Sequence, residues 1–185
     1  MWGVTLIVAA GLGAALYYTT RAPSASPWAV AVDTTHWRLR LSPGSVASFG
    51  PAVESDRAVV FVHIDRAAPT TDGSWTIDLD GTGLPSLDGL STLSIELSGT
   101  LPAARVVLSS ARERWRSARI AVHEPWTTHR LALADLEHQV MVGDQWKPAA
   151  TSPPASVQTL SLELGYQVND LNAAGLLRIG DVRAE

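Results

Sequence analysis

Short segments in which apolar and polar residues alternate occupy the chain from residue 36 almost to its end. Between residues 36 and 41, for example, Trp37, Leu39 and Leu41 alternate with Arg38 and Arg40. A period of two places successive side chains on opposite faces of a strand, and Gly, Pro, Asp and Ser separate the segments. The pattern predicts strands at residues 36–41, 58–65, 74–80, 92–97, 104–109, 119–123, 128–133, 157–164 and 176–182.

Helical periodicity is weak throughout this part of the chain. Only residues 111–117 and 132–138 have the composition of short helical turns, and no segment carries the apolar stripe of a long amphipathic helix. The run AVVFVHID at residues 58–65 is apolar enough for a central strand covered on both faces. The pattern therefore disfavours a parallel α/β fold and predicts an all-β, antiparallel sandwich or barrel.

The first 20 residues differ from the rest because none of their side chains carries a charge. At about 1.5 Å per residue, a helix of this length crosses most of a hydrocarbon layer about 30 Å thick. We expect a transmembrane anchor at residues 1–20, a Pro/Ser/Ala linker at 21–27 and a β-sandwich domain at 28–185. The alternatives are a cleaved signal peptide, which Pro23 and Pro27 disfavour by spoiling the cleavage sites, and a buried element of the domain.

Composition narrows the function classes. Of 185 residues, 46% are hydrophobic and 17% charged, which suits a folded domain with one sizeable core. The formal net charge of -4 disfavours nucleic-acid binding, because a protein that follows a phosphate backbone is usually basic. The chain has no cysteine, so neither disulfides nor thiolate metal sites are expected.

The order of elements in the second half resembles that of the galactose-binding-like jelly rolls found in many carbohydrate-binding modules. The segments that carry the resemblance are LSTLSIELSG, ARVVLSS, HEPWTTHRLALADLE with Trp126, VGDQW, VQTLSLELG and the closing LLRIGDVRAE. The resemblance covers residues 45–185 and implies an antiparallel jelly-roll β-sandwich that binds saccharide without catalysis. Relatives that hold a structural calcium often have an acidic residue where this chain has Gly180, which leaves Asp181 alone and argues against calcium.

The same strand order is also similar to that of the complex I intermediate-associated assembly proteins. In that family the jelly roll is thought to serve protein contacts. A protein-interaction or assembly module is therefore the second functional hypothesis, because a fold alone does not decide function.

Sugar recognition needs flat apolar side chains for ring faces and planar polar groups for hydroxyls. Trp115 and Trp146, which stand between predicted strands, are the candidate stacking platforms, and the remaining tryptophans of the domain fit core packing better. Arg112 and Arg114 beside Trp115 could donate paired hydrogen bonds to a glycan, or could simply form a solvated loop.

Glu96 and Glu163 lie on the polar sides of predicted strands and complete the candidate ligand set. They could also form the carboxylate pair of a small glycan-active enzyme, which is the third hypothesis. The chain contains no metal-ligand spacing, nucleophile elbow or nucleotide-binding loop, so we expect no catalytic residues, cofactor or metal.

The location of the domain depends on its orientation in the membrane. Arg21 directly after the predicted anchor would place the domain in the cytoplasm by the positive-inside rule. The resemblance to carbohydrate-binding modules favours an extracytoplasmic, periplasmic domain instead. The expected partners are a cell-envelope glycan or, in the second hypothesis, a membrane or envelope protein.

Overall fold

The computed structural model describes residues 36–55, 57–71, 76–82, 86–154, 156–170 and 172–185. The predicted anchor, the linker and the start of the predicted domain fall in residues 1–35 and so lie outside the described residues. Within those described ranges, no helix is long and apolar enough to cross a bilayer.

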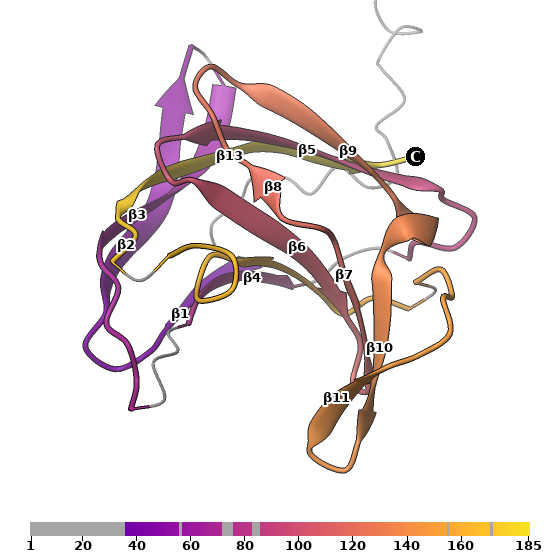
Figure 1. Cartoon of the computed structure of the whole chain (residues 1–185). Helices are drawn as coiled ribbons and strands as arrows, with labels where there is room; N and C mark the ends of the chain where they lie inside the picture. Colours follow the sequence, from indigo (N-terminus) through magenta and orange to yellow (C-terminus); the bar gives the residue numbers. More distant parts are fainter. Residues whose placement is uncertain (1–35, 56, 72–75, 83–85, 155, 171) are drawn as a thin grey trace, which may run out of the picture.

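The domain consists of two antiparallel sheets packed face to face, as Figure 1 shows. The smaller sheet has five strands in the order β2–β3–β13–β5–β9. Their bounds are Val46–Glu54 for β2, Arg57–Arg66 for β3, Gly175–Ala184 for β13, Thr92–Gly99 for β5 and Thr127–Ala132 for β9.

The larger sheet has eight strands in the order β1–β4–β12–β6–β7–β10–β11, with β8 paired to β6. Their bounds are Trp37–Leu41 for β1, Ile77–Thr82 for β4, Thr159–Glu163 for β12, Ala103–Ser109 for β6, Glu113–Arg116 for β7, Glu137–Val142 for β10, Gln145–Pro148 for β11 and Ile120–Ala121 for β8. The β10–β11 hairpin forms one edge of this sheet and extends to the lower right in Figure 1.

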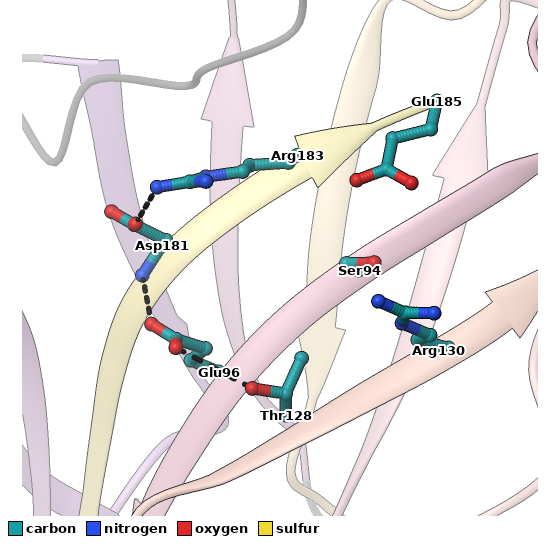
Figure 2. Close-up of a pocket in the computed structure, with 7 residues that line it drawn as sticks. All are labelled: Ser94, Glu96, Thr128, Arg130, Asp181, Arg183 and Glu185. Carbon is teal, nitrogen blue, oxygen red and sulfur yellow. Dashed lines mark hydrogen bonds and ion pairs between the residues drawn. The ribbon is translucent and has the colours of Figure 1, made fainter. Parts of the chain in front are cut away.

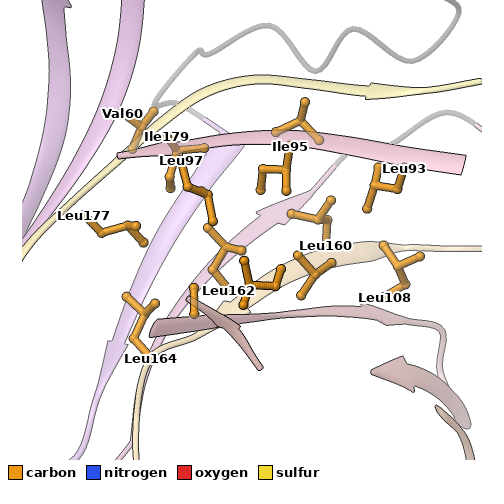
Figure 3. Close-up of a cluster of buried hydrophobic side chains, with 14 of the residues drawn as sticks. Val60, Leu93, Ile95, Leu97, Leu108, Leu160, Leu162, Leu164, Leu177 and Ile179 are labelled. Atoms are coloured by element: carbon orange, nitrogen blue, oxygen red, sulfur yellow. The ribbon is translucent and has the colours of Figure 1, made fainter. Parts of the chain in front are cut away.

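The core lies between the two sheets and is built from alternate residues of their central strands. Leu93, Ile95 and Leu97 of β5 point toward Leu160 and Leu162 of β12, as Figure 3 shows. Each of these side chains is at most 1% exposed. Burial of one such side chain contributes about 1.5–3 kcal/mol, so alternation on the central strands supplies much of the stability. It also turns the intervening polar residues outward.

All nine predicted strands are present with shifted ends, and the prediction of an all-β antiparallel sandwich is confirmed. The prediction of a helical turn at residues 111–117 is wrong, because Arg114 and Arg116 face outward while Trp115 faces the core, which is the geometry of strand β7. The turn predicted at residues 132–138 is present only as a short 3-10 turn at Leu133–Asp135. Strands β2, β10 and β11 were not predicted.

Candidate ligand-binding face

The outward side of the eight-stranded sheet, which we call the groove face, carries many polar side chains suited to ligand contact. In β12 the buried Leu160 and Leu162 alternate with Ser161 and Glu163, which point away from the core. The strand register then lines up outward residues across the sheet. Asp78 of β4 pairs with Glu163, which pairs with Arg105 of β6.

Two adjoining depressions on the groove face make one continuous groove. They share four lining residues, namely Thr76, Asp78, Arg114 and Glu163. The first depression is completed by Arg40, Val107, Ser109, Trp146 and Ser161. The second is completed by Arg116, Gly165, Tyr166 and Gln167. Because Trp146 lines only the first and Tyr166 only the second, the groove has one aromatic side chain toward each end.

Ion pairs fix the charged groups on the floor of the groove. The Oε2 atom of Glu163 lies 3.2 Å from Nη2 of Arg116 and 3.5 Å from Nη1 of Arg105. Because these three side chains are at most 24% exposed, they hold their positions better than surface ion pairs do. The guanidinium and carboxylate groups on the floor of the groove are therefore held in fixed positions before any ligand binds.

A second charged cluster lies on β1 and β4. Arg40 forms ion pairs with both Asp80 and Asp78, and the Asp80 carboxylate also accepts a hydrogen bond of 2.6 Å from the Ser161 hydroxyl. Burial raises the pKa of Asp78 to about 6, against the attraction of Arg40 and with further repulsion from Glu163 and Asp80. Asp78 is thus a carboxyl group that titrates near neutral pH inside the groove.

Trp146 and Arg114 form the end of the groove at strands β7 and β11. The guanidinium carbon of Arg114 lies 4.6 Å from the centroid of the Trp146 ring, a cation–π distance. Arg114 Nε also donates a 2.6 Å hydrogen bond to Gln139 Oε1. Burial, followed by the neighbouring Arg116, lowers the pKa of Arg114 from its usual value. The hydrogen bond to Gln139 therefore holds the Arg114 guanidinium over the Trp146 ring.

The opposite end of the groove depends on the loop that follows β12. Tyr166 is 50% exposed there, and Asn169 anchors the loop from below. The Asn169 side chain accepts from the amide of Ala103 and donates to the carbonyls of Ala103 and Leu164, at 2.8–3.0 Å. Three hydrogen bonds from a buried amide fix the base of the loop that carries Tyr166.

Trp115 does not lie on this face, and the expectation that it is an exposed stacking platform is wrong. Its side chain is 2% exposed and stacks on the His138 ring at a centroid distance of 5.0 Å with 4° between the planes. Trp115 Nε1 donates a 2.7 Å hydrogen bond to the carbonyl of Ser152. Because Arg114 and Arg116 of β7 take the outward positions, Trp115 must point into the core.

Glu96 lies on the other outer surface of the sandwich, on strand β5 of the five-stranded sheet. Ile179 pairs with Leu97 and Val182 with Ile95, so two residues of β13 stand opposite Glu96 in a β-bulge. Figure 2 shows the Glu96 carboxylate between the Asp181 amide, at 3.2 Å, and the Thr128 hydroxyl, at 3.4 Å. Glu96 therefore accepts the hydrogen bond of a backbone amide that the bulge leaves outside the strand pairing.

The structure brings together three of the six candidate ligand residues, Trp146, Arg114 and Glu163. Arg112 lies exposed in the turn before β7, where its carbonyl accepts a hydrogen bond from Met141, and it does not line the groove. Glu96 and Glu163 face away from each other on different sheets, so they cannot flank one glycosidic bond.

The sequence interpretation did not select Asp78, Asp80, Arg40 and Tyr166. The alternation in β1 and β4 had already placed the first three on the polar sides of predicted strands, and that signal could have selected them. No local pattern pointed to Tyr166. As for metals, no group of three acidic or histidine side chains in the described part of the chain is arranged to hold an ion.

No protein-family model matches the chain, and no curated protein matches it in sequence. Among solved structures it is similar to a family 11 carbohydrate-binding module from Clostridium thermocellum in complex with a β-1,3-1,4-mixed-linked tetrasaccharide. That similarity has a TM-score of 0.61 at 12% identity and covers 84% of this chain and 92% of the module.

The family 11 module of a cellulosomal cellulase from the same organism is similar with a TM-score of 0.58, also at 12% identity, over 80% of this chain and 85% of the module. At such low identity the likeness establishes the fold and not the ligand. The chain shares the antiparallel, two-sheet jelly-roll fold of these carbohydrate-binding modules.

Proposed function

We propose that the groove face binds a saccharide chain without catalysis. The observation that carries the proposal is the groove itself, in which Trp146 and Tyr166 stand toward opposite ends of a floor of fixed charged groups. Aromatic faces suit the C–H side of sugar rings, and paired guanidinium and carboxylate groups suit vicinal hydroxyls. The β-1,3-1,4-mixed-linked tetrasaccharide in complex with the similar family 11 module supports the choice of ligand class.

An extended ligand agrees with the direction of the groove. The first depression is lined by residues of β1, β12, β6, β7 and β11, so it runs across the strands of the sheet. Adjacent strands lie about 4.8 Å apart, so even five strand spacings amount to more than 20 Å. The groove is therefore long enough for several consecutive sugar units rather than a single one.

We also propose that residues 1–20 anchor the domain in a membrane, with the domain on the extracytoplasmic side. The support is the uncharged N-terminal segment, together with the ligand class, since envelope glycans lie outside the cytoplasm. Protease accessibility of the domain in sealed cells tests this orientation, and protection from added protease would contradict it.

The binding proposal is tested by titrating the full chain in detergent with the mixed-linked tetrasaccharide and a panel of other oligosaccharides by calorimetry. Trp146→Ala should weaken binding at least about tenfold, because an aromatic hot-spot side chain typically contributes about 2 kcal/mol or more. Arg112→Ala is the matched control, since Arg112 lies near the same sheet edge but outside the groove.

Two results would overturn the proposal. One is the absence of binding to every oligosaccharide by a correctly folded wild-type chain. The other is equal affinity of the Trp146→Ala and Arg112→Ala variants. Capture of a specific envelope protein whose binding depends on Trp146, without any glycan binding, would favour the protein-interaction hypothesis in its place.

A further inference from the structure

Asp78 has the most central and most unfavourable position of the charged groups in the groove. It lines both depressions, and its side chain is only 12% exposed. Glu163 stands directly opposite it on β12, and Asp80 follows on the same side of β4. Like charges opposite each other in a sheet are destabilising, so the fold alone does not explain an acidic residue here.

The positive groups around Asp78 compensate for its charge only in part. Arg40 of β1 approaches with Nη2 at 3.4 Å from Oδ2, but its side chain is 62% exposed and also pairs with Asp80. Arg116 of β7 pairs with Glu163 instead, and Arg114 of the same strand donates Nε to Gln139. The Asp78 carboxylate thus has one solvent-screened cation as its charged partner among the described residues.

Because of the balance between these groups, the pKa of Asp78 lies at about 6. Burial is the largest cause of the raised pKa of about 6, Arg40 opposes it, and Glu163 and Asp80 add to it. In the free protein the carboxyl is therefore about half protonated at pH 6. A new hydrogen-bond donor placed beside it would favour the ionised form.

We propose that Asp78 is a ligand-contacting residue of the groove, and that its ionised carboxylate accepts a hydrogen bond from a saccharide hydroxyl, so that ligand binding releases a proton. This inference rests on the proposed function of the groove and adds a regulation to it. A hydroxyl that donates to a carboxylate makes a charge-assisted bond, which is roughly twice as strong as a neutral one. A protonated carboxyl has one acceptor oxygen fewer and must find an acceptor for its own proton.

The expected change of the dissociation constant with pH follows from the pKa of Asp78. If only the ionised form binds, the fraction of competent protein falls from nearly one at pH 8 to about one tenth at pH 5. The dissociation constant should therefore rise about tenfold between these two pH values. At pH 6, binding should release about half a proton per chain, because about half of the free carboxyls carry one.

The experiment is calorimetric titration of the full chain with the mixed-linked tetrasaccharide at pH 5, 6 and 8, repeated at pH 6 in two buffers of different ionisation enthalpy. The wild-type chain should show the tenfold change and the proton release. The affinity of Asp78→Asn should differ by no more than about twofold between the three pH values, and its binding should release no proton. Asp80→Asn should keep a pH dependence whose midpoint lies at lower pH, because Asp80 is the smallest of the causes that raise the pKa of Asp78.

The outcomes separate this inference from the proposed function. Saccharide binding that is independent of pH, or stronger at pH 5, overturns the inference and leaves the binding function intact. Loss of the pH dependence in Asp80→Asn as well as in Asp78→Asn also overturns it. Absence of binding at every pH overturns both. The measurement on the wild-type chain alone decides the proton release, even if Asp78→Asn does not fold.

Discussion

The two faces of the eight-stranded sheet differ in how they use tryptophan at the end where β7, β10 and β11 lie. On the inner face, Trp115 stacks on His138 and is closed off from solvent. On the outer face, Trp146 stacks on Arg114 and lines the groove. The two tryptophans have similar sequence surroundings, with arginine or lysine beside each, yet one completes the core and the other remains available to a ligand.

The inner face is built for stability, because every polar atom of the Trp115 and His138 rings has a partner. His138 faces the carbonyl of Ala150 at 2.8 Å and the Glu113 carboxylate at 3.2 Å, and Trp115 Nε1 donates to Ser152. The groove face instead keeps Asp78 opposite Glu163 and leaves Arg116 Nε without a hydrogen-bond partner among the described residues. Removal of the Trp115 ring should therefore lower stability, whereas removal of the Asp78 charge should raise it.

The largest expected effect is at Trp115. Trp115→Ala should lower the free energy of unfolding by about 3–5 kcal/mol, because it removes a buried aromatic side chain and leaves a cavity. Urea denaturation followed by tyrosine fluorescence or circular dichroism measures the change. Trp146→Ala should change the same quantity by about 1 kcal/mol at most, since its ring is partly exposed and its cation–π contact is weak at the surface.

Trp115→Phe separates packing from hydrogen bonding in the same experiment. Phenylalanine keeps a ring against His138 but removes the hydrogen bond to the Ser152 carbonyl, so an intermediate loss of about 1–2 kcal/mol is expected. If Trp115→Ala were no more destabilising than Trp146→Ala, the contrast between the inner and outer faces would be wrong.

The second expected effect has the opposite sign and belongs to Asp78. Its pKa in the folded chain is raised from 3.8 to about 6, so the folded state binds the proton more tightly than the unfolded state. The resulting stability is fully present below pH about 4 and is lost as the pH rises through about 6. At about 1.4 kcal/mol per pKa unit, the ionised carboxylate costs up to about 3 kcal/mol at pH 7.

Asp78→Asn should therefore be more stable than the wild-type chain by about 1–3 kcal/mol at pH 7 and about equally stable at pH 4. Denaturation midpoints of the two chains at pH 4, 5, 6 and 7 measure the difference, in which the titration of all other groups cancels. If the variant were less stable than the wild type at pH 7, the stabilisation by the Arg40 ion pair would exceed the destabilisation from burying the Asp78 charge. The ionised Asp78 would then not destabilise the fold.

Much of this fold could be predicted from residue alternation, because central strands such as β5 and β12 alternate without interruption. The run at residues 92–97 became β5 with Leu93, Ile95 and Leu97 in the core, as the pattern required. The edges were harder to predict. Strand β2 contains Gly50 and Pro51, which usually interrupt a strand but are tolerated on β2 because it is an edge strand.

The candidate site was harder to predict than the fold, because it depends on the register between distant strands. Their positions between predicted strands selected Trp115 and Trp146 equally, but the direction of each side chain depends on which residues of β7 and β11 face the core. Glu96 and Glu163 are both outward glutamates on central strands, and only the assignment of their strands to different sheets separates them. Asp78 gains its raised pKa chiefly from burial and to a smaller extent from Glu163, 85 residues later, and neither cause appears in a local sequence pattern.

The smallest of these expected effects tests the role of Glu96 on the third surface, the outside of the five-stranded sheet. Glu96→Ala should lower the free energy of unfolding by about 1 kcal/mol, because the Asp181 amide in the bulge of β13 loses its acceptor. Glu96→Gln keeps one acceptor oxygen and should lose less of the free energy of unfolding.

Saccharide affinity should be unchanged in both Glu96 variants, since the core separates Glu96 from the groove, whereas Glu163→Gln should weaken binding. Equal loss of affinity in Glu96→Gln and Glu163→Gln would place ligand on both surfaces. It would remove the distinction between a groove face that binds and an opposite face where Glu96 lines a separate polar pocket and accepts a hydrogen bond from the bulge.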